Sequence, residues 1–116
     1  MDTVSMTIGV SWTVAGLIII GLAIPLVLRR IGPNNLYGIR LSQSLQSEDA
    51  WYAINSFGGK RMIVWAAPIL LVGFATFFLR LKANTGLSLV LGFGPLIFVL
   101  MPAFESWCFA QKFQSR

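Results

Sequence analysis

Three long apolar runs alternate with polar segments along this chain, at residues 8–28, 62–79 and 87–109. At about 1.5 Å per helical residue, the first run would be roughly 31 Å long and the second roughly 27 Å. Both lengths suit the hydrocarbon core of a bilayer, which is about 30 Å thick. The pattern therefore predicts three transmembrane helices.

The first run has a second possible interpretation, as the core of a cleaved signal peptide. Such a peptide places basic residues before a short apolar core. Here residues 1–7 carry only Asp2 as a charged side chain, and the Arg29–Arg30 pair follows the run. Trp12 lies near the start of the run, as interfacial aromatic residues do. We therefore interpret the run as a retained membrane anchor.

The longest polar segment, residues 29–61, joins the first two predicted spans. Ser47 is typical of a helix N-cap and precedes two acidic residues, which are favourable in the first turn of a helix. The Gly58–Gly59 pair is typical of a helix end. We therefore predict a short amphipathic helix over residues 48–57, lying in the membrane interface with its tryptophan side toward lipid or the bundle.

Composition supports an all-α integral membrane protein of one domain. The 116 residues are 56% hydrophobic and only 11% charged, and the mean hydropathy is +0.75. Soluble domains are about 25% charged, and a small soluble domain could not bury this much apolar surface. The single cysteine, Cys108, cannot form an internal disulfide, and there is no histidine. We expect no transition-metal site, no cofactor and no enzymatic activity.

The net charge of +5 is explained by membrane topology rather than by nucleic-acid binding, because the cations cluster at the ends of the apolar runs. With three spans, the long loop and the C-terminal tail share one side and carry seven Lys and Arg residues, whereas the other side carries two. The positive-inside rule then predicts an external N-terminus and an internal C-terminus.

Glu105 is the one carboxylate inside an apolar run. An ionisable group at that depth needs a partner, and the predicted topology places several basic residues on the same side. We expect an intramembrane ion pair between Glu105 and one of three arginines: Arg29, Arg30 or Arg40. For Arg40 itself, Glu48 and a lipid phosphate are further candidate partners.

The long loop and the predicted helix carry a recognisable pattern, PNNLYGIR followed by SLQSEDAWYAINSFGGK. This pattern resembles the signature of the SdpI/YfhL family of small bacterial membrane proteins. The matching positions are Asn34, Tyr37, Gly38, Arg40, Ser44, Leu45, Glu48, Trp51, Asn55 and Gly59.

The resemblance implies a multi-pass protein of the bacterial plasma membrane. Well-known members protect a cell from a secreted toxic peptide and can hold a repressor at the membrane, so the implied partner is a peptide toxin or a soluble regulator. The residues that we expect to bind it are Asn34, Tyr37, Gly38, Arg40, Glu48, Trp51 and Asn55. An alternative is an accessory subunit that packs against a larger membrane complex, which the small residues on the first and third spans would suit.

Overall fold

The computed structural model describes residues 2–34 and 36–113, and over these residues the regular structure is entirely helical. Three helical stretches are long and apolar enough to cross a membrane, which confirms the predicted number of spans. The third stretch is made of two helices that follow one another. The elements are α1 (Thr3–Val27), α2 (Glu48–Thr76), α3 (Thr85–Phe93), α4 (Leu96–Ala110) and a short 3₁₀ turn, η1 (Gln111–Phe113).

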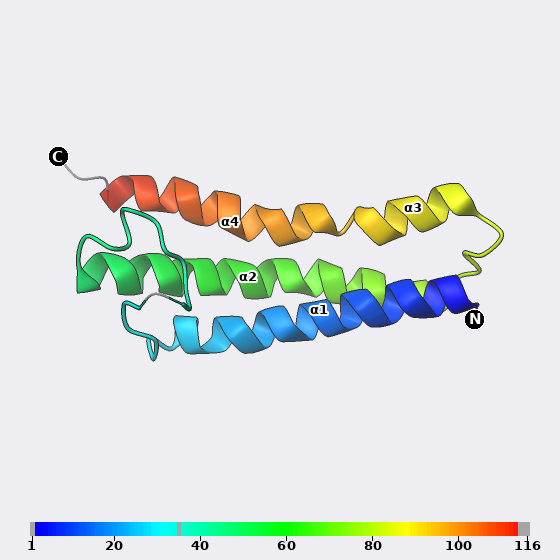
Figure 1. Ribbon diagram of the computed structural model, residues 1–116, viewed down its shortest axis with the longest axis horizontal. Coiled ribbons are helices and arrows are strands. Elements are labelled where there is room, and N and C mark those ends of the chain that lie inside the picture. Colours follow the sequence, from blue (N-terminus) through cyan, green and yellow to red (C-terminus); the bar gives the residue numbers. More distant parts are fainter. Residues whose placement is uncertain (1, 35, 114–116) are drawn as a thin grey trace.

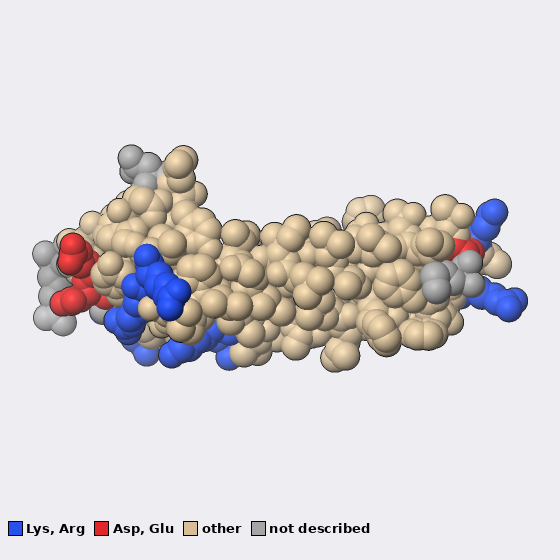
Figure 2. Space-filling model, turned by 90° about the horizontal axis from the view of Figure 1, so that it is seen from below, with Lys and Arg blue, Asp and Glu red and all other residues tan. Residues whose placement is uncertain are grey.

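The helices form an elongated antiparallel bundle of 56 × 25 × 21 Å. In Figure 1, α2 runs between α1 and the α3–α4 pair. The long loop, which in the structure comprises residues 28–47 between α1 and α2, lies at the end of the molecule opposite the N-terminus. Figure 2 shows that the charged side chains on the visible face gather at the two ends and leave the middle of the bundle bare. A charge-free middle flanked by charged ends is the distribution that a bilayer-spanning protein requires.

Helix α2 is continuous, so the prediction of a separate interfacial helix over residues 48–57 is wrong. Its 29 residues correspond to about 43 Å, longer than the roughly 30 Å apolar core. The Gly58–Gly59 pair does not end the helix, because it serves close packing instead. A Cβ on Gly59 would lie 3.0 Å from the carbonyl oxygen of Ala23 in α1, and both glycines are buried.

Other glycines bring α1 and α2 together farther along the bundle. A Cβ on Gly73 would lie 2.8 Å from the backbone nitrogen of Thr13, and one on Gly9 would lie 3.0 Å from the carbonyl oxygen of Gly73. Gly21, in contrast, faces open space. The missing side chains therefore let the two backbones approach at defined positions, as small residues do in membrane helix pairs.

The third span is interrupted between α3 and α4. Gly94 is the C-cap of α3, and Pro95, which supplies no backbone N–H, is the N-cap of α4. Helix α4 packs on α2 through two stacked aromatic pairs, Phe57–Phe109 and Trp65–Phe98, with ring centroids 4.2 and 5.8 Å apart.

At the opposite end from the long loop, Asp2 joins the start of α1 to the connection before α3. Its carboxylate accepts hydrogen bonds from the backbone N–H of Ser5 (2.7 Å) and of Lys82 (2.8 Å). The bonds from Lys82 and then Ser5 favour the ionised form and hold the pKa of Asp2 below its ordinary value of 3.8.

Candidate functional site

The first turn of the long loop is organised by the Asn34 side chain. Its Oδ1 accepts hydrogen bonds from the backbone N–H of Leu36 (2.8 Å) and of Tyr37 (2.6 Å). Its Nδ2 donates to the carbonyls of Gly32 (2.8 Å) and Tyr37 (2.9 Å). An asparagine amide that makes all four bonds defines the path of the surrounding backbone.

The loop then folds back along α1. The Tyr37 hydroxyl donates a hydrogen bond to the carbonyl of Leu22. Leu22 lies five residues before the end of α1, or about 7.5 Å along the helix axis. The neighbouring Leu36 is 97% exposed. The Tyr37 bond therefore ties the loop to the side of α1 rather than to its end.

Gly38 is required at the next position for two reasons. Its φ of +115° is in the region that favours glycine. In addition, a Cβ on Gly38 would lie 2.8 Å from Oδ1 of Asn55 and 2.9 Å from Cζ2 of Trp51. The loop backbone therefore lies directly on the side chains of α2.

Asn55 and Trp51 hold the loop to α2. The Asn55 amide is buried, accepts from the Ile39 N–H (2.5 Å) and donates to the Ile39 carbonyl (3.3 Å). Trp51 is fully buried, and its indole N–H donates to the carbonyl of Ile31 (2.7 Å). Of the two directions expected for the tryptophan side, toward lipid or toward the bundle, the lipid-facing one is wrong, because the loop covers the ring.

Five of the seven predicted site residues therefore shape the loop or hold it to α1 and α2. They are Asn34, Tyr37, Gly38, Trp51 and Asn55. The remaining two, Arg40 and Glu48, are exposed. Within the described residues neither has a hydrogen-bond or ion-pair partner. Ser44 is a further member of the signature that the loop uses: its hydroxyl donates to the Ile39 carbonyl (2.8 Å).

Two apolar recesses flank the loop where it crosses α2. The first has a volume of about 350 Å³ and the second about 190 Å³. Ile39 and Met62 line both of them. The walls of the first are completed by Leu22, Leu26, Leu36, Tyr37 and Gly38. Those of the second are completed by Val99, Pro102, Ala103 and Ser106.

The Ile39 side chain separates the two recesses. It lies so close to Gly58 that a Cβ on that glycine would overlap Cδ1 of Ile39. Arg40 follows it on the exposed side of the loop. The site therefore combines a fixed loop backbone, two apolar recesses and one cation with no ionic partner among the described residues.

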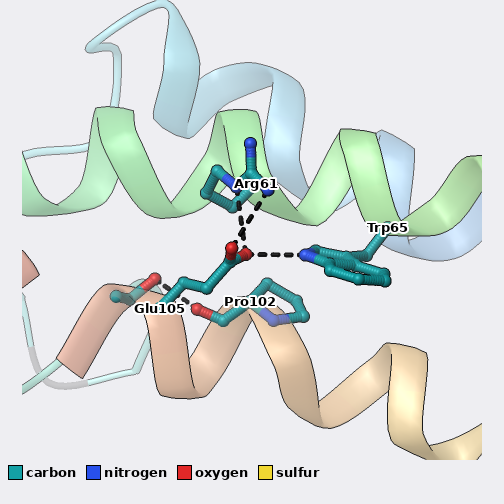
Figure 3. Close-up of polar contacts among 5 residues, drawn as sticks. Arg61, Trp65, Pro102 and Glu105 are labelled. Atoms are coloured by element: carbon teal, nitrogen blue, oxygen red, sulfur yellow. Dashed lines mark hydrogen bonds and ion pairs between the residues drawn. The ribbon is translucent and has the colours of Figure 1, made fainter. Parts of the chain in front are cut away.

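Glu105 pairs with Arg61 and not with Arg29, Arg30 or Arg40, so the predicted partners are wrong. Its two carboxylate oxygens accept from Nε and Nη2 of Arg61, both at 3.0 Å. The close-up in Figure 3 shows this pair reaching across from α2 to α4.

The indole N–H of Trp65 adds a third bond to the Glu105 carboxylate, at 2.6 Å (Figure 3). Arg61 and Trp65 are four residues apart, so they share the α2 face that packs against α4. The sequence placed Arg61 on the same side of the membrane as Glu105, and the four-residue spacing from Trp65 was the signal that could have identified it. The resulting contact joins α2 to α4.

In the part of the chain that the structure describes, no group of three or more His, Cys, Asp or Glu side chains is placed to hold a metal ion. Cys108 is a free, exposed thiol on α4.

Comparison with known proteins supports the resemblance. A family model described as the SdpI/YfhL protein family matches residues 30–103. A search of curated proteins and a search of solved structures found no match. The matched region contains the long loop, all of α2 and α3, and half of α4. Because the match covers well over half of the chain and includes the loop built by the signature residues, this multi-pass membrane protein belongs to the SdpI/YfhL family.

Proposed function

We propose that this chain is an SdpI-like immunity or signalling protein of the bacterial plasma membrane, which binds a peptide toxin or a soluble regulator without chemical change. The proposal is supported by a difference among the signature residues: most of them are used within the loop, and one is left exposed. Asn34, Tyr37, Gly38, Trp51 and Asn55 shape the loop, while Arg40 stays exposed beside two apolar recesses. A rigid loop that presents an unpaired cation is suited to recognition.

The chemistry of this surface favours an amphipathic peptide with a carboxylate. The recesses on either side of Ile39 would take apolar side chains, since their walls are largely aliphatic. The Arg40 guanidinium would pair with a carboxylate in a two-bond geometry, for which arginine is better suited than lysine. The exposed Glu48 at the start of α2 would select against a strongly acidic partner.

The orientation is part of the proposal. The excess of Lys and Arg at the loop end favours an internal loop and C-terminus and an external N-terminus. In this arrangement the recesses face a peptide already inserted in the membrane, and Arg40 faces a regulator in the cytosol.

Complementation of a deletion strain tests the proposal. Cells that lack this chain should become sensitive to a peptide toxin secreted by sister cells, and the wild-type chain should restore protection. Arg40→Ala should fail to restore it. Arg80→Ala should succeed, because it removes an exposed arginine from the connection between α2 and α3, at the other end of the bundle. All variants must reach equal levels in the membrane.

Two outcomes would contradict the proposal. One is a deletion strain that is no more sensitive than its parent. The other is co-purification of the chain in mild detergent with a larger membrane complex that falls apart without it, which would support the accessory-subunit alternative.

A further inference from the structure

Three exposed cations, Arg29, Arg30 and Lys60, are at the same end of the bundle, where α1 ends beside α2. Arg29 and Arg30 follow the last residue of α1, Val27. The carbonyl of Val27 accepts a hydrogen bond from the Ser56 hydroxyl of α2 (3.5 Å). Lys60 is four residues after Ser56, so it lies on the same face of α2 one turn farther along. Figure 2 shows Lys and Arg side chains gathered at this end of the molecule, next to the charge-free middle.

The described acidic residues do not neutralise this cluster. The single salt bridge between described residues joins Arg61 to Glu105, which removes that carboxylate. Glu48 and Asp49 are in the first turn of α2, and Glu48 is about 18 Å from Lys60 along the helix axis. For Lys60 this separation exceeds the Debye length of about 8 Å at physiological ionic strength, and neither Arg29 nor Arg30 forms a salt bridge with a described acidic residue. None of the three cations is therefore paired with a carboxylate among the described residues.

Exposed apolar side chains continue from the cluster toward the middle of the bundle. On α1, Ile24 and Leu28 are four residues apart and both about half exposed. On α2, Val64 follows Lys60 by one turn and is also about half exposed. A ligand that satisfies both parts of this surface must carry a negative group and apolar chains. Inorganic phosphate or an acidic protein would use the cations alone.

We propose that Arg29, Arg30 and Lys60 bind the headgroup phosphate of an anionic phospholipid, with its acyl chains against the apolar surface of α1 and α2. Basic pockets between membrane helices bind anionic headgroups in this way, and arginine pairs readily with phosphate oxygens. The site is on the opposite face of α2 from Met62 and the recesses, because Lys60 and Met62 are two residues apart on the helix. It does not depend on the proposed immunity role.

Native mass spectrometry of the full chain in a neutral detergent tests the proposal. Short-chain phosphatidylglycerol and phosphatidylcholine are titrated separately, and the apparent Kd of the first bound lipid is measured. The wild-type chain should retain phosphatidylglycerol more strongly. Arg29→Gln with Arg30→Gln should weaken that binding by roughly 25-fold, and Lys60→Gln by roughly five-fold, at about five-fold for each cation near the membrane surface.

The matched control is Arg80→Gln with Lys82→Gln, which removes two exposed cations from the other end of the bundle. Its apparent Kd should stay within about two-fold of the wild type, because charges farther apart than the Debye length are screened by salt. Arg29→Lys with Arg30→Lys keeps the charge and should retain most of the binding. Circular dichroism and size-exclusion chromatography identify variants that fold; if the double arginine variant does not, Lys60→Gln decides the result.

Several outcomes would overturn the proposal. Equal retention of the two lipids by the wild type would do so, and so would equal losses in the two double glutamine variants. Saturation by inorganic phosphate at the same concentration as the lipid would assign the site to a soluble anion. Binding of poly-glutamate without binding of phosphatidylglycerol would assign it to an acidic protein partner.

Discussion

Replacement of Asn55 by alanine should release the loop from α2 without unfolding the bundle. The Asn55 side chain is 1% exposed, and its Oδ1 is the one described acceptor for the Ile39 N–H, at 2.5 Å. The Ile39 carbonyl keeps a second donor, the Ser44 hydroxyl. Alanine therefore leaves one partly buried backbone donor without its protein partner, and an unpaired buried donor costs about 1–3 kcal/mol.

The magnitude can be expressed as the stability of the closed loop. A loss of about 2 kcal/mol corresponds to a roughly 30-fold increase in the open population. Gly73, where α1 also packs closely on α2, lies 18 residues after Asn55 in the same helix, or about 27 Å along its axis. The loss should therefore be confined to the loop end of the bundle. Amide hydrogen exchange of the chain in detergent micelles should then show protection at Ile39 falling by about 30-fold, with little change in the middle of α2.

Ser56→Ala is the matched control, because Ser56 is the next residue, is 4% exposed and makes one long bond of 3.5 Å. Its effect on exchange at Ile39 should stay within about two-fold, since it leaves no buried donor unpaired. If Asn55→Ala left the protection of the Ile39 amide unchanged, the amide clamp would not be what holds the loop.

Three further predictions concern the bundle. Glu105→Gln should lower the free energy of unfolding in mixed micelles by about 1.5 kcal/mol, because it weakens bonds to a charged guanidinium. The control, Glu48→Gln, should change this free energy by less than about 0.5 kcal/mol. Equal effects of the two variants would contradict the role of the Arg61–Glu105 ion pair. Gly73→Ala should lower the free energy of unfolding by about 1–3 kcal/mol, because the new Cβ meets the α1 backbone. Gly21→Ala should be neutral or raise this free energy by up to about 1 kcal/mol. The reverse order would refute the claim that Gly73 lets the backbones of α1 and α2 approach closely. The pKa of Asp2 is lowered in the folded state, so its stabilisation is complete above the unfolded pKa and lost as pH falls through the folded one. Asp2→Asn should accordingly reduce the fall in Tm between pH 6 and about pH 2, and an unchanged pH dependence would show that Asp2 does not contribute.

Most of the loop's site residues could be recognised in the sequence, but their roles could not. Asn34 and Gly38 stand out as turn residues, and Ser47 is the N-cap that the pattern predicts, accepting from the Ala50 N–H at 3.1 Å. Their chemistry acts over a few residues. Asn55, in contrast, bonds to a residue sixteen positions away, and nothing in its neighbourhood in the sequence indicates that partner.

Gly59 shows that the end of a helix, too, can depend on a contact with a distant part of the chain. Two glycines after a polar helical segment have the local signature of a helix end, and only the approach of α1 at Ala23 gives them another purpose. Glu105 had several basic residues available on one side of the membrane, and the choice of Arg61 depends on how α4 is rotated against α2. Trp51 is buried because the loop happens to cross it.

Three helices long and apolar enough to cross a membrane, and a polar loop with the family signature, could be recognised from the residues alone, because span length, hydropathy and turn chemistry are properties of adjacent residues. The packed fold was needed to show that α2 continues through its glycines, that Glu105 pairs with Arg61, and that the loop backbone lies on Asn55 and Trp51. Those outcomes depend on contacts between segments far apart in the chain, whose geometry no local pattern contains.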